Sequence, residues 1–305
     1  HLLPSISGHY VLAVTIEYDL SLAEKRTAWV KDVFGQEDLP IPNGFTDEDI
    51  DLKAPRLYSD TFYLYYILNK TRISLNINSL ALSTSTRPDI RVFYAHCCDS
   101  TTDVFQKTVD LMLAQGIYIR PPCITVEKTV DMVKRQTFMR GFLGERRPLL
   151  AQEISGLYLG ARINSIGKDM VLGFRQVVKS KQLRDYLDRG IKLANKFFGR
   201  FSSFLEKEGI PVPVSSDTFV TDSTVSPFSD KLILAQVLYM NAAGMVAKGT
   251  ILSTSLRHDI ISSLALLITE IADYTEDGVN IMIDNGWLEE PPCLVDREEL
   301  KNQVH

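Results

Sequence analysis

Hydrophobic residues recur three or four positions apart along most of the chain, which is the spacing of α-helices that bury one face. In the second half this pattern predicts four helices, over residues 152–178, 181–208, about 229–252 and about 255–285. The second of them has the clearest seam, in which steps of four and three alternate along Leu187, Ile191, Ala194, Phe198, Phe201 and Leu205. Two short turns and one long crossover would join these helices, as in a four-helix bundle.

One stretch of the sequence occurs twice with few changes. Residues 80–90 read LALSTSTRPDI and residues 250–260 read TILSTSLRHDI, and the agreement continues as far as PPC at 121–123 and at 291–293. A repeat of this length indicates a duplicated unit. In each copy, the repeated phrase is expected to end one helix and to start the next with the same turn.

The first copy has one predicted helix fewer than the second. Its helices are expected from about Tyr10, over about 59–84 and over about 87–115. Counting back from the second copy places the opening helix of the first copy before residue 1. The predicted fold is therefore all-α, with two tandem four-helix bundles, 1–123 and 149–305, of which the first lacks its opening helix.

Between the two bundles lies a connector, 124–148, that is rich in basic residues. Its segment from Val126 to Phe138 could form one amphipathic helix, with natural breaks at Gly141 and Gly144. The connector could offer a basic surface to an acidic partner, but packing of its apolar face between the bundles is the preferred interpretation. The incomplete first bundle would leave an apolar groove, which residues 124–145, the second bundle or another chain should cover.

Composition narrows the functional classes. The formal net charge of −5 argues against general nucleic-acid binding. No apolar run reaches the roughly 18–20 residues of a membrane span, and the nearest one, Ile260 to Ala272, is expected to be a buried helix. Cys97, Cys98, Cys123 and Cys293 are too few and too unevenly spaced for a disulfide framework, which favours a reducing cytoplasm. Protein partners or self-association are the expected interactions.

A four-helix bundle with a long crossover raises the question of a di-iron carboxylate centre. That centre needs Glu-x-x-His on two of its helices, so that both ligands lie on one helix face. No glutamate in this chain is followed by histidine three residues later, and the corresponding places hold Thr27 and Phe198. The sequence also has no phosphate loop, no G-x-S-x-G and no nucleotide fingerprint. We therefore expect no cofactor, and catalysis is disfavoured.

The remaining metal candidates are carboxylates. Asp103 and Asp273 recur at the same place in both copies, and Glu270 and Glu276 extend an acidic stripe in the second copy. Such a cluster could hold a divalent cation. A solvated helix face, or pairing with arginine, is the preferred interpretation.

The repeated turn carries Ser85, Arg87 and Asp89 in one copy and Ser255, Arg257 and Asp259 in the other. An acid in the first turn stabilises a helix N-terminus, and the serine is available as its cap. The arginine can bridge to a neighbouring carboxylate or carbonyl. A structural role therefore suffices, and an anion site beside the helix N-terminus is the alternative.

Several phrases together resemble a known family, namely DLKAPRLYSDTF, STSTRPDI, QGIYIRPPC, DSTVSPFSDKL and EDGVNIMIDNGWLEEPP. The family is an uncharacterised group of tandem-repeat proteins from spore-forming bacilli, a domain of unknown function that is similar to spore coat proteins. The resemblance covers nearly the whole chain and implies a ferritin-like fold. Its relatives often carry a histidine on the second helix of each copy, where this chain has Arg26 and Phe197.

Three functions remain open. The first is a non-catalytic structural or packing protein associated with the spore or with sporulation. The second is an unconventional metal-binding oxidoreductase that uses carboxylates without the histidine pair. The third is a carrier of a small molecule or lipid in a cavity between helices, where Phe197, Phe198 and Phe201 could line the pocket.

Overall fold

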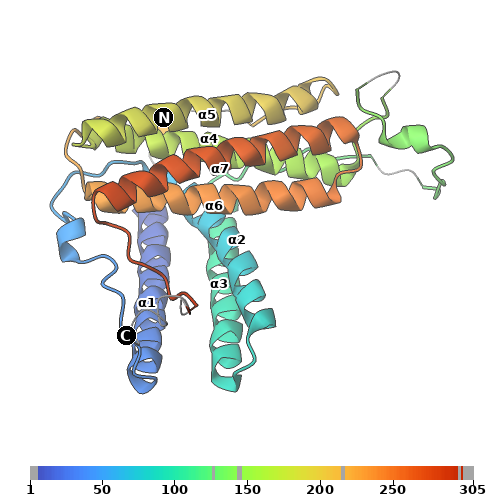
Figure 1. Cartoon of the computed structure of the whole chain (residues 1–305). Coiled ribbons are helices and arrows are strands. Elements are labelled where there is room, and N and C mark those ends of the chain that lie inside the picture. Colours follow the sequence, from blue (N-terminus) through green and yellow to red (C-terminus); the bar gives the residue numbers. More distant parts are fainter. Residues whose placement is uncertain (1–5, 126–127, 143–145, 214–216, 295–296, 298–305) are drawn as a thin grey trace.

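A computed structural model describes residues 6–125, 128–142, 146–213, 217–294 and 297, with only the backbone of 6–11. Within those ranges the chain is helical and has no β-strand (Figure 1). The helices are α1 (Ile6–Gln36), α2 (Asp60–Thr84), α3 (Pro88–Ala114), α4 (Ala151–Val177), α5 (Lys181–Glu206), α6 (Asp230–Thr254) and α7 (His258–Asp284). Three short 3-10 helices, Asp47–Asp49, Gln136–Met139 and Asp217–Phe219, lie in the connections.

Local signals set the ends of the helices in the second copy. Ser180 and Ser229 cap α5 and α6, because each hydroxyl accepts a hydrogen bond from the amide three residues ahead. Gly209 and Gly286 follow α5 and α7 with φ of +69° and +65°, a backbone region that glycine adopts without strain. The four predicted helices are therefore confirmed within a few residues of their expected ends.

The second copy closes into a four-helix bundle with one long crossover. At one end, Arg257 at the start of α7 contacts Glu208 after α5 and the backbone of Arg147 before α4. At the other end, Asp230 at the start of α6 accepts hydrogen bonds from the amides between α4 and α5. The connection from α5 to α6 therefore runs the length of the bundle. Ferritin-like bundles share such a crossover, and the ferritin-like assignment stays a prediction.

The first copy repeats the same helices at a constant offset. The bounds of α2 and α3 lie 170 positions before those of α6 and α7, and Ser59 caps α2 as Ser229 caps α6. Gly116, with φ of +67°, matches Gly286. These matches confirm the duplication as two tandem helical bundles. In Figure 1 the three helices α1 to α3 run across the direction of α4 to α7.

The two crossovers pair with each other in a symmetric way. Asp51 N donates to Pro227 O, and its counterpart Thr221 N donates to Leu57 O. The bonds from Ser59 N to Phe219 O and from Ser229 N to Asp49 O form a second matched pair. Exchange of the two copies therefore leaves the pattern unchanged, as in a dimer with a two-fold axis. The duplicated chain thus contains an internal two-fold arrangement at this contact.

A shared core fills the junction between the copies. Tyr58, before α2, is 2% exposed and donates its hydroxyl proton to Met170 O on α4 at 2.6 Å. Its ring lies against Gly173, where an added Cβ would come within 2.5 Å of it. Phe62 and Leu64 of α2 lie in the same cluster as Met170 and other residues of the second copy. The second bundle therefore anchors the first half of α2.

The predicted helix in the connector is wrong for the residues that the structure describes. Val126 and Glu127 lie outside those residues, 128–135 contain no helix, and Gln136–Met139 form a short 3-10 helix. Short helices are marginal in water unless an apolar face packs onto something. Val130 and Met132 are 97% and 75% exposed, so that support is missing here.

The connector also does not cover the first bundle. It lies at the end of the second bundle where α7 begins, and a Cβ at Gly141 would approach Asp259 Oδ1 to 2.0 Å. The second bundle covers only the first half of α2. Farther along the first copy, Leu80 is 66% and Val92 57% exposed. The expectation of a covered groove is therefore fulfilled only at the junction.

One described helix, α6, is long and apolar enough to cross a membrane by length and composition. The sequence pattern had singled out Ile260 to Ala272 instead. A third of the most apolar window of α6 is buried, and the helix packs against α4 and α7 in the second bundle. Helices in the core of a bundle often meet the same criterion of length and composition. The helix α6 belongs to the second bundle, and the described residues contain no clear membrane span.

Candidate functional site

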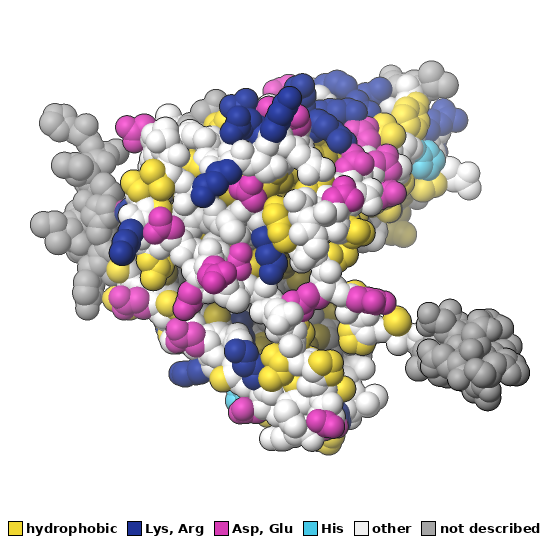
Figure 2. Space-filling view, turned by 60° about the vertical axis from the view of Figure 1, so that its left-hand side comes forward, with side chains coloured by type: hydrophobic (Ala, Val, Ile, Leu, Met, Phe, Trp, Pro, Cys, Tyr) yellow, Lys and Arg dark blue, Asp and Glu magenta, His cyan; other side chains and the backbone are white. Residues whose placement is uncertain are grey.

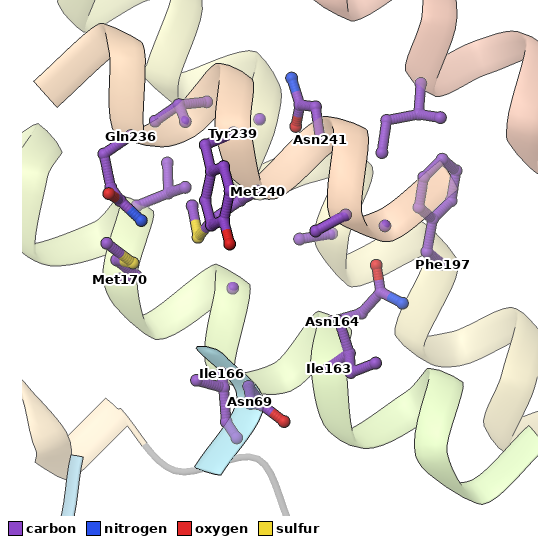
Figure 3. A pocket seen from close by; sticks show the side chains of 18 of the residues that line it. Asn69, Ile163, Asn164, Ile166, Met170, Phe197, Gln236, Tyr239, Met240 and Asn241 are labelled. Atoms are coloured by element: carbon purple, nitrogen blue, oxygen red, sulfur yellow. The ribbon is translucent and has the colours of Figure 1, made fainter. Parts of the chain in front are cut away.

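The middle of the second bundle contains a cavity of about 120 Å³ beside residues of α2. Figure 3 shows Ile163, Ile166 and Met170 of α4 around this space, opposite Tyr239 and Met240 of α6. Phe197 of α5, which is 1% exposed, closes one side. Di-iron bundles gather their carboxylates at mid-bundle, whereas the residues that line this cavity are mainly apolar and include no carboxylate.

Lys248 of α6 is the buried positive charge of this cavity, whose lining also includes Lys70 of α2. Lys248 is 3% exposed, its Nζ lies 3.5 Å from Gly244 O, and the same atom lies 4.8 Å above the ring of Phe197. No carboxylate of the described residues forms an ion pair with it. Burial lowers the pKa of Lys248 to about 8, because an ammonium group loses hydration there. A cation at this place disfavours binding of a metal ion.

Asn241 adds a second polar group to the cavity wall. Its side chain is 8% exposed, and its Nδ2 has no hydrogen-bond partner among the described residues. Figure 3 shows Asn241 on α6 and Asn164 on α4 at this level of the bundle. Asn164 Nδ2 donates to Gly160 O within its own helix. The cavity therefore combines a mainly apolar lining with four amides, Asn69, Asn164, Gln236 and Asn241, and with the amines of Lys70 and the buried Lys248.

Two tyrosines clasp α5 to α7 next to the cavity. The rings of Tyr186 and Tyr274 stack with centroids 4.2 Å apart. Each hydroxyl donates to the backbone carbonyl of the other tyrosine, at 3.1 and 3.2 Å. The two hydroxyls reach over Gly190 and Gly278, where an added Cβ would lie 2.3 and 2.4 Å from them. Glycine at both places allows this reciprocal pair to form.

Gly190→Ala is therefore expected to lower the free energy of unfolding by about 1–3 kcal/mol, because the new methyl group displaces Tyr274 and its hydrogen bond. Chemical denaturation followed by circular dichroism measures the change. Gly199→Ala on the same helix is the control, since nothing lies within 4 Å of its added Cβ. Alanine favours the helix there by up to about 1 kcal/mol. Equal effects of the two substitutions would contradict the clasp.

The repeated turn forms a buried ionic cluster in the second copy. Arg257 is 2% exposed, forms two hydrogen bonds with Asp259 at 3.0 and 2.9 Å, and contacts Glu208 at 3.1 Å. Glu153 accepts hydrogen bonds from Arg147 and from the amides of Leu256 and Arg257. The turn thereby ties the ends of α4, α5 and α7 together.

The pKa of Glu153 shows that this cluster stabilises a negative charge. Burial by itself would raise the pKa of this fully buried carboxyl. The hydrogen bonds from Arg147 and from the amides of Leu150 and Leu256 outweigh burial and lower the pKa to about 2. Glu153 is therefore ionised over the ordinary pH range. Sequence patterns did not single out Glu153, because its donors come from two segments, 147–150 and 256–257, that lie about 100 residues apart.

The first copy contains the same cluster in an exposed form. Arg87 pairs with Asp89 and with Glu37, both at 2.7 Å, but Arg87 is 43% exposed. The arginine bridge predicted for the turn is found in both copies. The serine does not cap the following helix, however. The hydroxyls of Ser85 and Ser255 donate back to Ala81 O and Ile251 O, so these serines end α2 and α6.

The candidate metal carboxylates do not converge. Asp103, Asp273 and Glu276 are exposed on helix surfaces, and Glu270 forms an ion pair with Lys196 at 2.7 Å. No group of three or more His, Cys, Asp or Glu in the described ranges could hold a metal ion. This placement agrees with a solvated helix face and with pairing to a cation, and it brings none of the four residues to the cavity.

The residues at the compared positions of the second helix, Arg26 in the first copy and Phe197 in the second, make different kinds of contact. Phe197 lies inside the second bundle, while Phe198, which the seam pattern had placed inside, is only partly buried. In the first copy, Arg26 donates to Cys97 O and to the hydroxyls of Ser100 and Thr101 on α3. The contact between α1 and α3 is therefore partly polar where the second bundle has an aromatic core.

The thiols and histidines among the described side chains form no group that could hold a metal ion. Cys97 is buried, Cys98 is half-buried, and Cys123 and Cys293 are exposed and unpaired. Burial raises the pKa of the Cys97 thiol, which keeps it protonated. His96 and His258 are exposed on the helices α3 and α7. Among the described residues that line the mid-bundle cavity there is no cysteine and no histidine.

The fold and the cavity together define a class, namely all-helical tandem-bundle proteins with a mainly apolar cavity at the middle of one bundle. The family model described as "Protein of unknown function (DUF3231)" matches residues 12–130 and 137–300. Because the two matches cover most of the chain, the protein belongs to that family. Its two segments correspond to the two copies seen in the structure.

Comparison with other proteins adds a structural likeness. No protein with a curated description matches the chain. The crystal structure of a candidate spore coat protein from Bacillus halodurans is similar with a TM-score of 0.47 and 18% sequence identity. The similarity covers 49% of this chain and 98% of that protein.

Proposed function

We propose that this protein is a non-catalytic structural protein, associated with the spore, that works by packing against protein partners or copies of itself. The apolar centre of the second bundle carries the proposal. Where a metal enzyme of this architecture would gather carboxylates and histidines, this chain places Phe197, the Tyr186–Tyr274 clasp and the ammonium-bearing Lys248. Spore association rests on the resemblance of the sequence.

The surface supports packing as the mode of action. Large hydrophobic side chains remain exposed on every helix of the first copy, among them Leu20 on α1, Leu80 on α2 and Val92 on α3. Figure 2 shows hydrophobic side chains interspersed with charges of both signs on the face that it presents. A surface of mixed sign is a poor match for a nucleic-acid backbone and suits protein contacts.

The alternatives receive less support. An oxidoreductase would need inward carboxylates, and the candidates lie on exposed surfaces or pair with lysine. A lipid carrier would need a pocket of roughly 300 Å³ or more, whereas the cavity measures about 120 Å³. Phe197 borders this cavity, while Phe201 packs against Gly160 and Phe198 is partly buried in the same core cluster.

Protein purified without chelator is expected to contain no stoichiometric iron, manganese or zinc, and to associate in a concentration-dependent way. Elemental analysis and sedimentation velocity on the same sample measure both properties. Leu80→Lys is expected to weaken the association without changing the helical content, because Leu80 is exposed in the free chain. One or two metal ions per bundle would instead favour the oxidoreductase. A strict monomer at all concentrations would contradict self-association.

A further inference from the structure

A second cleft lies at the boundary between the two copies and shares Asn69 and Ile166 with the mid-bundle cavity. Its volume is about 160 Å³, and α2, α4 and the segment after α3 form its walls. The polar and aromatic residues that line it are Tyr65, Asn69, Arg72, Tyr118, Ser155, Tyr158 and Arg162. The cleft thus brings two arginines from different copies together.

Arg162 of α4 is built into the wall of this cleft. It is 8% exposed, and its guanidinium lies 3.8 Å above the ring of Tyr65. Its Nη2 is fully buried and meets no acceptor at hydrogen-bond geometry among the described residues, and the nearby guanidinium offsets part of the rise that burial causes in the pKa of Tyr65. A guanidinium offers five donors in a rigid fork, and Nη2 shows that the described residues do not use all the donors of Arg162.

Arg72 of α2 adds a second positive charge. It is half-buried, its Nη2 lies 3.5 Å from Tyr118 Oη, and its guanidinium lies 6.0 Å from the ring of Phe105. Burial lowers the pKa of Arg72, and the nearby charge of Arg162 adds to that effect. No carboxylate in the described part of the chain forms an ion pair with either arginine. Two like charges that are partly desolvated require a counter-charge.

We propose that this cleft binds a small oxyanion, a phosphate or carboxylate group, between Arg162 and Arg72. The planar forks of two arginines fit such an anion, and the hydroxyl of Tyr118 is within reach of the same place. The site is specific to this boundary, because the counterpart of Arg72 in the second copy is Ala242. Bound anion would link the two copies across their junction.

Thermal unfolding in increasing inorganic phosphate, at constant ionic strength, tests the site. The melting temperature of the wild-type protein should rise and then saturate, because an anion that binds only the folded state stabilises it. Arg162→Met should lose the saturable rise and keep only the small general effect of phosphate on folded proteins. Arg175→Met is the matched control on the same helix, since Arg175 pairs with Asp188 at the surface. This control should behave like the wild type.

Isothermal titration calorimetry with phosphate and with acetate identifies the chemistry. Binding of phosphate alone indicates a phosphoryl group, and binding of acetate alone indicates a carboxylate. In buffer with chloride as the only anion, Arg162→Met should melt no earlier than the wild type, because it removes an uncompensated charge. If neither anion binds the wild type, or if Arg162→Met responds to phosphate as the wild type does, the proposal is overturned.

Discussion

Arg257→Ala is expected to lower the free energy of unfolding by about 3–5 kcal/mol. Removal of one partner from a buried ionic cluster leaves the others uncompensated. Asp259, which is 7% exposed, would lose both of its hydrogen bonds to the guanidinium, and Glu208 would lose its ion pair. Because Arg257 Nη1 also donates to the backbone of Arg147, one further contact between the helix ends would be lost. Urea denaturation followed by circular dichroism measures the loss.

The duplication provides a matched control for this experiment. Arg87→Ala removes the same residue from the same motif, but in the first copy the arginine and its partners are 43–49% exposed. Exposed ion pairs contribute about 0–1 kcal/mol, so the second substitution should have little effect. Similar losses for Arg87→Ala and Arg257→Ala would show that burial of the cluster is not what makes it stabilising.

Lys248→Met is expected to raise the free energy of unfolding by about 3 kcal/mol at pH 7. The lowered pKa of about 8, against 10.5 for a free side chain, corresponds to an energetic cost of that order for keeping the ammonium group buried. Methionine has similar length and no charge, and it can fill the apolar cavity beside Phe197. The substitution therefore removes the cost while it preserves the packing.

The stabilisation expected for Lys248→Met should depend on pH in a definite direction. Between pH 8 and 10.5 the unfolded chain holds a proton on Lys248 that the folded protein has released, so this residue makes wild-type stability rise with pH. The advantage of Lys248→Met should therefore be full below pH 8 and vanish toward pH 10.5. Lys196→Met is the control, because Lys196 is 59% exposed and pairs with Glu270 at the surface. A pH-independent loss of stability in Lys248→Met would show that the amine makes a favourable interaction in the fold.

The unusual position of one buried charge, Lys248, is visible in the sequence. Between Leu232 and Leu256, Lys248 is the only charged residue, and a lone lysine in such an apolar helix is an anomaly that the pattern displays. The pairing of Tyr186 with Gly278 and of Tyr274 with Gly190 is different. Each partner lies on another helix about 90 residues away, so no spacing along the chain reveals it.

The helix ends, the duplication and the all-α class follow from the sequence by itself, because capping serines, glycines with positive φ and helical periodicity act over a few neighbouring residues. Two predictions from the sequence were wrong, namely the helix in the connector and the burial of Phe198 on α5. Val130 is exposed, and Phe197 is buried in place of Phe198. Both outcomes depend on which residues lie opposite in the folded chain. Only the tertiary structure decided the symmetric pairing of the crossovers, the burial of Arg257 against the exposure of Arg87, and the meeting of Arg72 with Arg162. Those features depend on long-range packing between the two copies, which local patterns do not encode.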